Sequence, residues 1–165
     1  MRSDSRNGSY STSKRAQTLN TSKTKTTVIK QNMSRMYFFV MYNLSGIQKG
    51  IQAGHAAVEY SRYARNDKDY ASFDEFADNH KTFILLNGGG SNDMLQRRAE
   101  LDNLNIPNAV FYEPDLNGSL SAIAFILTDD VYNVDINDPG VEGDEDYARR
   151  YAIKSYISKF RLASN

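Results

Sequence analysis

The 165-residue sequence predicts an α/β fold in which helices cover both faces of one sheet. Four short segments rich in apolar, aromatic and branched residues are typical of strands, and segments with helical periodicity lie between most of them. Strands that alternate with helices favour a sheet covered on both faces. The length suits one domain with a substantial core, which we expect to span residues 35–165.

The chain divides at about residue 35. Residues 1–34 are rich in Ser, Thr, Asn and Lys, and we expect a disordered basic tail because so few apolar groups cannot offset the entropy of ordering. Residues 1–35 hold eight Lys/Arg and one acid, a charge of +7, whereas residues 36–165 hold 12 Lys/Arg and 19 acids, a charge of −7. The tail's charge favours RNA or an acidic surface. A solvated tail, or a true start at Met33 or Met36, fits the pattern equally well.

The first half of the domain is predicted to form a strand, a helix and a short helix. Met36–Tyr42 is almost wholly apolar and aromatic, as expected of a strand. Ser45 is a good N-cap for the helix that periodicity predicts over Gly46–Tyr63. A capping-box pattern that begins at Ser72 predicts a short helix over Phe73–Asn79.

The second half is predicted to add three strands and two helices. The strands Ala109–Tyr112 and Leu120–Leu127 are too close in sequence for a helical crossover, so we expect them to be antiparallel or joined by a tight connection. Acids at the start and bases at the end indicate a closing helix over Asp144–Leu162. The other expected elements are a strand over Thr82–Leu86, a glycine turn at Gly88–Gly90, a helix that ends near Asn103, and an acidic loop over Asp129–Gly143.

Composition excludes several kinds of chemistry. The chain has no cysteine, so disulfides, thiolate nucleophiles and cysteine-ligated metals are ruled out. With only two histidines, we expect no metal site and no cofactor. No apolar run approaches the roughly 20 residues that span a bilayer, and the first residues lack the apolar core of a signal peptide. A cytoplasmic protein with no membrane partner is therefore expected.

The first predicted helix carries two stripes of side chains at helical spacing. We expect the apolar stripe to face the core. The polar stripe, turned by about 100°, should lie near the end of the first strand, where open α/β sheets place ligands. The alternative is a partly exposed face whose amides meet water. The apolar stripe is Ile47, Ile51, Gly54 and Val58, and the polar stripe is Gln48, Gln52, His55 and Glu59.

An acidic segment joins the last two predicted strands. Pro114 fixes one backbone angle, and Asn117 with the glycine after it turns the chain. The segment leaves a strand end and could bring Glu113 or Asp115 toward the polar stripe, where a carboxylate beside an imidazole or a lysine would serve as a general base. Ser121 could place a hydroxyl there. An ordinary solvated loop is the alternative.

The glycine turn at Gly88–Gly90 stands between a predicted strand and a predicted helix. Such a turn can expose backbone N–H groups to a phosphate, with Gly89 and Ser91 as candidate contacts. It lacks the lysine of a P-loop and the spacing of a dinucleotide fingerprint, so a flexible turn is the alternative.

Over residues 36 to about 128 the chain resembles the type 2 peptidyl-tRNA hydrolase superfamily, in particular its small bacterial and phage-borne members. The resemblance implies a three-layer α/β/α sandwich with a small four-stranded mixed sheet. Four segments in this order carry it: Gln52-Ala-Gly-His55-Ala56, Asn105-Ile106-Pro107, Glu113-Pro114-Asp115 and Ser121-Ala122-Ile123-Ala124.

The resemblance implies hydrolysis of an ester bond in peptidyl-tRNA or a related aminoacyl ester. A carboxylate would orient or deprotonate water, and a lysine with neighbouring polar groups would stabilise the oxyanion. Gln48 stands where the family enzymes have a lysine, and Lys49 is one residue further along. The expected catalytic residues are Lys49, His55, Asp115 and Glu113, and the expected substrate-binding residues are Gln48, Gln52, Asn117, Ser121, Gly89 and Ser91.

Two other functions remain open at this point. The acidic body and the displaced lysine favour a non-catalytic binder, or sponge, of a nucleotide or cyclic-nucleotide signal, a role suited to phage counter-defence. The basic tail or the acidic segment Asp129–Asp146 could instead make the protein an interaction module. The ligand would then be tRNA, a nucleotide or a protein, and a homodimer is an open arrangement.

Overall fold

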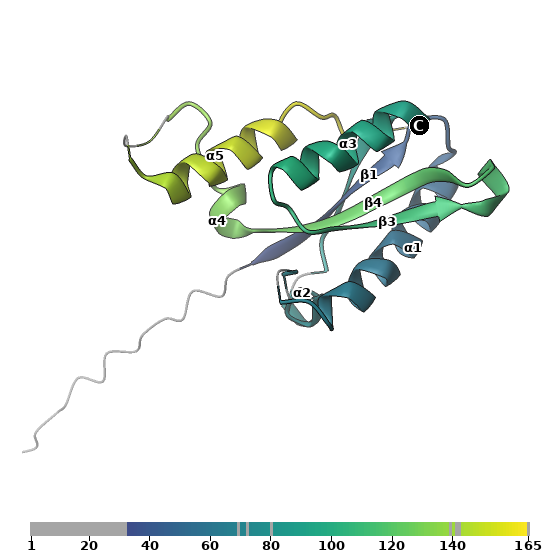
Figure 1. The fold of residues 1–165 in the computed structure, drawn as a ribbon, viewed down its shortest axis with the longest axis horizontal. Helices are drawn as coiled ribbons and strands as arrows, with labels where there is room; N and C mark the ends of the chain where they lie inside the picture. Colours follow the sequence, from purple (N-terminus) through teal and green to yellow (C-terminus); the bar gives the residue numbers. More distant parts are fainter. Residues whose placement is uncertain are drawn as a thin grey trace, which may run out of the picture. The chain divides into compact units, whose positions relative to one another are not determined.

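The computed structural model describes residues 33–68, 70–71, 73–79, 81–138, 140 and 143–164. They form a mixed α/β fold around a four-stranded mixed sheet (Figure 1). Strand order is β2-β1-β4-β3, with β1 parallel to β2 and antiparallel to β4, and β3 antiparallel to β4 as predicted. The elements are β1 Ser34–Met41, α1 Gly46–Ala64, α2 Phe73–Asn79, β2 Phe83–Gly89, α3 Ser91–Asn103, β3 Asn108–Glu113, a 3-10 turn η1 Pro114–Leu116, β4 Ser119–Thr128, α4 Asp129–Tyr132 and α5 Glu145–Ile157.

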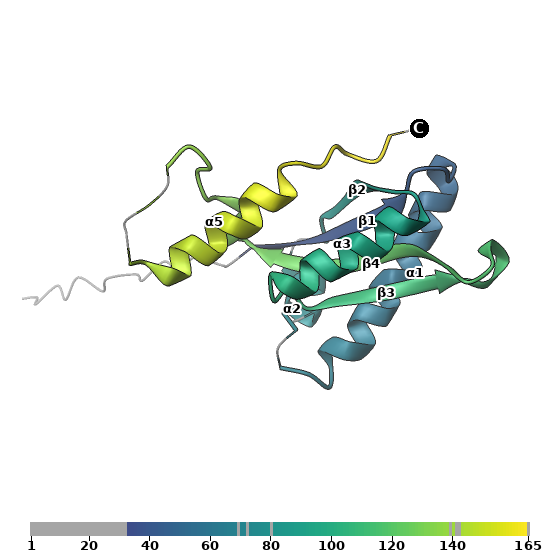
Figure 2. The ribbon, with the colours of Figure 1, turned by 45° about the horizontal axis from the view of Figure 1, so that its top comes forward.

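Helices cover both faces of the sheet, which makes three layers. α1 and α2 lie on one face, and α3 and α5 lie on the other (Figures 1 and 2). Successive side chains of a strand point to opposite faces, and β1 supplies both cores: Met36, Phe38 and Val40 pack with α1 and α2, and the residues between them pack with α3 and α5.

The buried face of α1 differs from the prediction. The apolar stripe is turned outward: Ile47 is 81% exposed, and Ile51 and Val58 are also exposed. Small residues on the neighbouring strands explain the difference, because they let the helix lie close to the sheet on its own alanines. The buried residues of α1 are Lys49, Gln52, Ala53, Ala56, Ala57 and Tyr60, and the facing strand residues include Ala109, Ala122 and Ala124.

Three other predicted elements are corrected. Strand β2 extends to Gly89, so Gly88 and Gly89 belong to the strand and not to the predicted turn. The closing helix ends at Ile157, well before Leu162, and the chain then runs along the free edge of β2. There the Asn87 N–H donates to Arg161 O (3.0 Å) and the Ala163 N–H to Leu85 O (2.8 Å). The predicted acidic loop begins with the short helix α4. Residues 1–32, which hold most of the predicted tail, and the predicted cap Ser72 lie outside the described residues.

Candidate functional site

A chain of hydrogen bonds joins α1 to the ends of β3 and β4. The Gln52 Nε2 donates to Glu113 Oε2 (2.5 Å), and the Ser121 Oγ donates to Gln52 Oε1 (2.7 Å). Gln52 and Ser121 are both buried. The helix face and the acidic segment singled out in the sequence therefore meet, and Gln52 is the residue that connects them.

A β-bulge aims the Ser121 hydroxyl at the helix. Pairing between β3 and β4 shifts between Phe111 and Tyr112, so Phe111 faces Ala122, Tyr112 faces Leu120, and Ser121 is the extra residue. Beyond the bulge, Leu120 belongs to the core under α3 and α5, and Ala122 to the core under α1. Ser121 and Ala122 thus both face α1, whereas a regular strand would turn Ser121 to the other face.

Glu113 is the carboxylate that the fold holds in place. Besides the bond from Gln52, its Oε1 accepts from the Asp115 backbone N–H (3.3 Å), which caps the turn η1. The Asp115 side chain is exposed, and Asn117 is exposed in the left-handed conformation with φ 55°. Of the two predicted acids, the structure brings Glu113 into the network and leaves the side chain of Asp115 at the surface.

Lys49 is buried on α1, and its side chain bonds to the C-terminal segment beside β2, at the opposite edge of the sheet from Glu113. It lies three residues before Gln52, on the same face of α1, and only 4% of its surface is exposed. Its Nζ donates to the backbone carbonyl of Ser164 (2.6 Å). Within the described residues none of the ion pairs includes Lys49. An ammonium has three donors, so donor capacity remains for a bound group.

His55 flanks the network without joining it. Its ring stacks on Phe111, with ring centroids 4.4 Å apart and an interplanar angle of 19°, and its side chain is exposed. In the part of the chain that the structure describes, no hydrogen bond joins the imidazole to a carboxylate. The stack fixes the ring beside the strand that carries Glu113.

Three predicted substrate contacts lie apart from the network. Gln48 is exposed and closes the capping box at Ser45, with its Oε1 accepting from the Ser45 N–H (3.0 Å). The Gly89 N–H donates to Asn87 Oδ1 and the Gly90 N–H to Asp93 Oδ2, so side chains of β2 and α3 already occupy these donors. Ser91 is the exposed first residue of α3.

Two further features, a metal site and a membrane-spanning helix, were sought among the described residues. They contain no cluster of three or more His, Asp or Glu side chains able to hold a metal ion. Among the same residues, no helix combines the length and apolar character needed to cross a membrane.

The sequence did not single out the segment that covers Lys49. Residues 158–164 were assigned largely to the closing helix, although nothing in their own pattern pairs them with β2. A scan against models of known protein families and a search of curated proteins each found no match.

Proposed function

We propose that the domain hydrolyses an ester bond of the peptidyl-tRNA or aminoacyl type at the site formed by Lys49, Gln52, Glu113 and Ser121. The observation that carries this proposal is the carboxylate of Glu113, which buried Gln52 and the turn η1 hold in place at the end of β3. Lys49 is buried one turn before Gln52 on the same face of α1. The resemblance of the Gln52–Ala56 and Glu113–Asp115 segments to the type 2 peptidyl-tRNA hydrolases supports the same substrate class.

Each group has a defined part in the reaction. Glu113 accepts a proton from water as the water oxygen bonds to the ester carbonyl carbon. The ammonium of Lys49, released from the Ser164 carbonyl and turned toward Gln52, donates to the carbonyl oxygen, which becomes negatively charged. The bond from carbon to the ribose oxygen then breaks, and the proton held by Glu113 passes to that oxygen, which leaves a free acid and an alcohol.

The covering segment implies that the site opens before reaction. The Ser164 carbonyl occupies one N–H of Lys49, and the ammonium is otherwise buried. A substrate carbonyl would take the place of the Ser164 carbonyl, so the chain beyond Phe160 must shift from Lys49 while the substrate is bound.

The charge distribution indicates that one part of the chain binds tRNA and another part carries the reaction. Residues 36–165 carry −7 and would repel a phosphate backbone, whereas residues 1–35 carry +7. The basic segment would therefore supply most of the attraction, and the KM for tRNA would rise steeply with salt. Such a substrate places the reaction in the cytoplasm.

Hydrolysis of an N-acetylated aminoacyl-tRNA tests the proposal. Glu113→Gln should lower kcat/KM by about 10²–10⁴-fold. Lys49→Met, which keeps a long side chain in the buried position, should lower it by about 10²–10³-fold. The matched controls Glu145→Gln and Lys159→Met change exposed residues of the closing region and should retain wild-type activity.

Circular dichroism and thermal unfolding must show that each variant is folded. Cleavage by the wild type that persists in a folded Glu113→Gln/Lys49→Met double variant would overturn the mechanism. An inactive wild type, tested at low salt with the whole chain, would overturn the proposed activity.

A further inference from the structure

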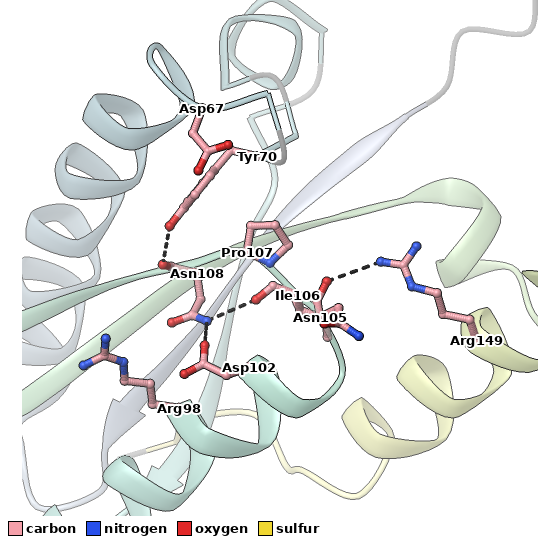
Figure 3. Close-up of a pocket in the computed structure, with 9 residues that line it drawn as sticks. All are labelled: Asp67, Tyr70, Arg98, Asp102, Asn105, Ile106, Pro107, Asn108 and Arg149. Carbon is pink, nitrogen blue, oxygen red and sulfur yellow. Dashed lines mark hydrogen bonds between the residues drawn. The ribbon is translucent and has the colours of Figure 1, made fainter.

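A cavity of about 570 Å³ lies where β3 begins, and Tyr70 forms part of its wall (Figure 3). The two arginines that line it point apart (Figure 3). Arg98 Nη1 donates to Tyr112 Oη (3.2 Å). Arg149 Nη2 donates to Asn105 O (3.3 Å) on the other side of the turn. The two guanidinium groups therefore do not meet around one ligand.

The C-terminal segment, residues 161–164, runs along the outer edge of β2 and joins the two helical layers (Figure 2). Just before the segment, Phe160 packs against the core under α3 and α5. At its far end, Ala163 packs against the core under α1, and the Ser164 carbonyl accepts from Lys49 Nζ (2.6 Å). Residues 161–164 therefore form a strap over the free edge of the sheet.

Few contacts hold the strap in place. Among the described residues, two backbone hydrogen bonds join it to β2, through Arg161 O and the Ala163 N–H. Between these bonds, Leu162 forms a single antiparallel bridge with Leu86, and its side chain is 68% exposed. A segment with so few buried apolar contacts opens at a low cost in free energy.

The chain just before the strap is held more firmly. The ring centroid of Phe160 lies 4.7 Å from that of Phe39 and 5.1 Å from that of Tyr156. The Phe160 N–H also donates to Ile157 O (3.1 Å), at the end of α5. The strap can therefore leave β2 by rotation of the backbone after Phe160, while α5 keeps its contacts with the core.

Lys49 is the group that the strap covers. Its surface is only 4% exposed, and its bond to Ser164 O directs the ammonium toward the β2 edge of the sheet. Glu113 ends β3, which is the opposite edge strand. While the strap is in place, the ammonium is thus held away from the carboxylate.

We propose that the strap is an autoinhibitory element that controls access to Lys49. With the strap on β2, the Ser164 carbonyl holds the ammonium and the strap excludes solvent from it. Release of the strap exposes the ammonium and lets it turn toward Gln52. The effect on hydrolysis rests on the proposed function, whereas the control of access to Lys49 does not.

Acetylation of lysines with sulfosuccinimidyl acetate, followed by mass spectrometry, measures access to Lys49. In the wild type, Lys49 should react slower than exposed Lys68 by about tenfold or more. Ala163→Pro removes the N–H that donates to Leu85 O, and should raise the rate at Lys49 by about two- to tenfold, as expected for loss of one hydrogen bond. A chain that ends at Phe160 should raise this rate further.

Leu162→Ala is the matched control, because it changes an exposed side chain and keeps both backbone hydrogen bonds. It should leave the rate at Lys49 unchanged. Circular dichroism must show that the strap variants are folded. The proposal is overturned if Lys49 reacts as fast as Lys68 in the wild type, or if neither folded strap variant raises the rate at Lys49.

Hydrolysis of an N-acetylated aminoacyl-tRNA separates this proposal from the proposed function. Ala163→Pro should raise kcat/KM by about two- to tenfold, in step with the acetylation rate. Unchanged hydrolysis by an active variant whose Lys49 has become accessible would overturn the autoinhibition. No hydrolysis by the wild type or by either strap variant would overturn the proposed function, and acetylation would still decide whether the strap controls access to Lys49.

Discussion

The two ends of β3 use their polar side chains in opposite ways. At the Glu113 end, Gln52 and Ser121 are buried and bonded to each other, and Lys49 is covered by the C-terminal segment. At the Asn108 end, charged side chains stand exposed around an open cavity. Changes at the first end should therefore cost folding free energy as well as any activity, and changes to the exposed charged side chains at the second should leave folding almost unaffected.

Alkaline pH should have the largest effect, and part of that effect arises at the cavity end. Tyr60 is buried, contacts Tyr70 at the cavity wall and donates to Ala71 O. Burial, and then the nearby Tyr70, raise the pKa of Tyr60 above its usual value of 10.0. Burial is also the main cause that raises the pKa of Tyr70, followed by Tyr63 and Asp67.

Because these pKa values are raised in the folded protein, the free energy of unfolding should fall at alkaline pH. In the unfolded chain these tyrosines lose their protons near pH 10, whereas the folded protein keeps them. The stabilisation is complete below pH 10 and is lost as the pH rises through the folded-state pKa, at about 1.4 kcal/mol per pH unit for Tyr60. Urea unfolding between pH 8 and pH 11 should show this decline, and Tyr60→Phe should reduce its slope. An equal slope in the variant would contradict the prediction.

The sequence predicted elements better than it predicted the directions in which side chains point. The N-cap Ser45, the helix Phe73–Asn79 and the antiparallel pairing of β3 with β4 follow from local patterns, and the structure has all three. The buried face of α1 does not follow, because it depends on alanines of distant strands that let the helix approach.

The candidate site and the cavity show the same limit of prediction from the sequence: side-chain directions depend on contacts that the sequence does not show. Gln52 and Glu113 were singled out from residue type and spacing, but the bulge that turns Ser121 toward them is a property of strand pairing. Arg98 and Arg149 carry no local signal, since the turn Asn105–Pro107 and the packing of α3 and α5 bring them to one cavity. In both places, contacts between residues that are distant in the sequence place the side chains, and a local sequence pattern does not contain this information.

The next largest effect should come from breaking the buried network. Gln52→Leu removes the partner of Glu113 Oε2 and the shorter of the two hydrogen bonds of the Ser121 hydroxyl, and should lower the free energy of unfolding by about 1–3 kcal/mol. The control Gln96→Leu changes an exposed glutamine bonded to Glu100 and should stay within about 0.5 kcal/mol. Urea unfolding at pH 7 gives both values. Equal stability of the two variants would show that the network adds nothing to folding.

A smaller cost is expected for a hydrogen bond at the cavity wall. Tyr70→Phe removes the bond to Asn108 O and keeps the ring, so the free energy of unfolding should fall by about 0.5–1.5 kcal/mol. Tyr112→Phe, which removes an exposed contact with Arg98, is the matched control and should cost less. Thermal unfolding of both variants makes the comparison. A larger loss in Tyr112→Phe would mean that the wall of the cavity is not held by Tyr70.

The smallest expected effect is a gain in stability on α1, the helix that packs along β3. A Cβ added at Gly54 would meet no atom within 4 Å, so Gly54→Ala loses no packing and lowers the entropy of the unfolded chain. The free energy of unfolding should rise by about 0.5–1 kcal/mol. Gly88→Ala is the matched contrast, because its Cβ would lie 2.2 Å from Met94 Sδ and should destabilise the fold. If Gly54→Ala is stabilising but impairs ester hydrolysis, the open face beside His55 admits substrate; if hydrolysis is unchanged, the substrate approaches from the side of Glu113.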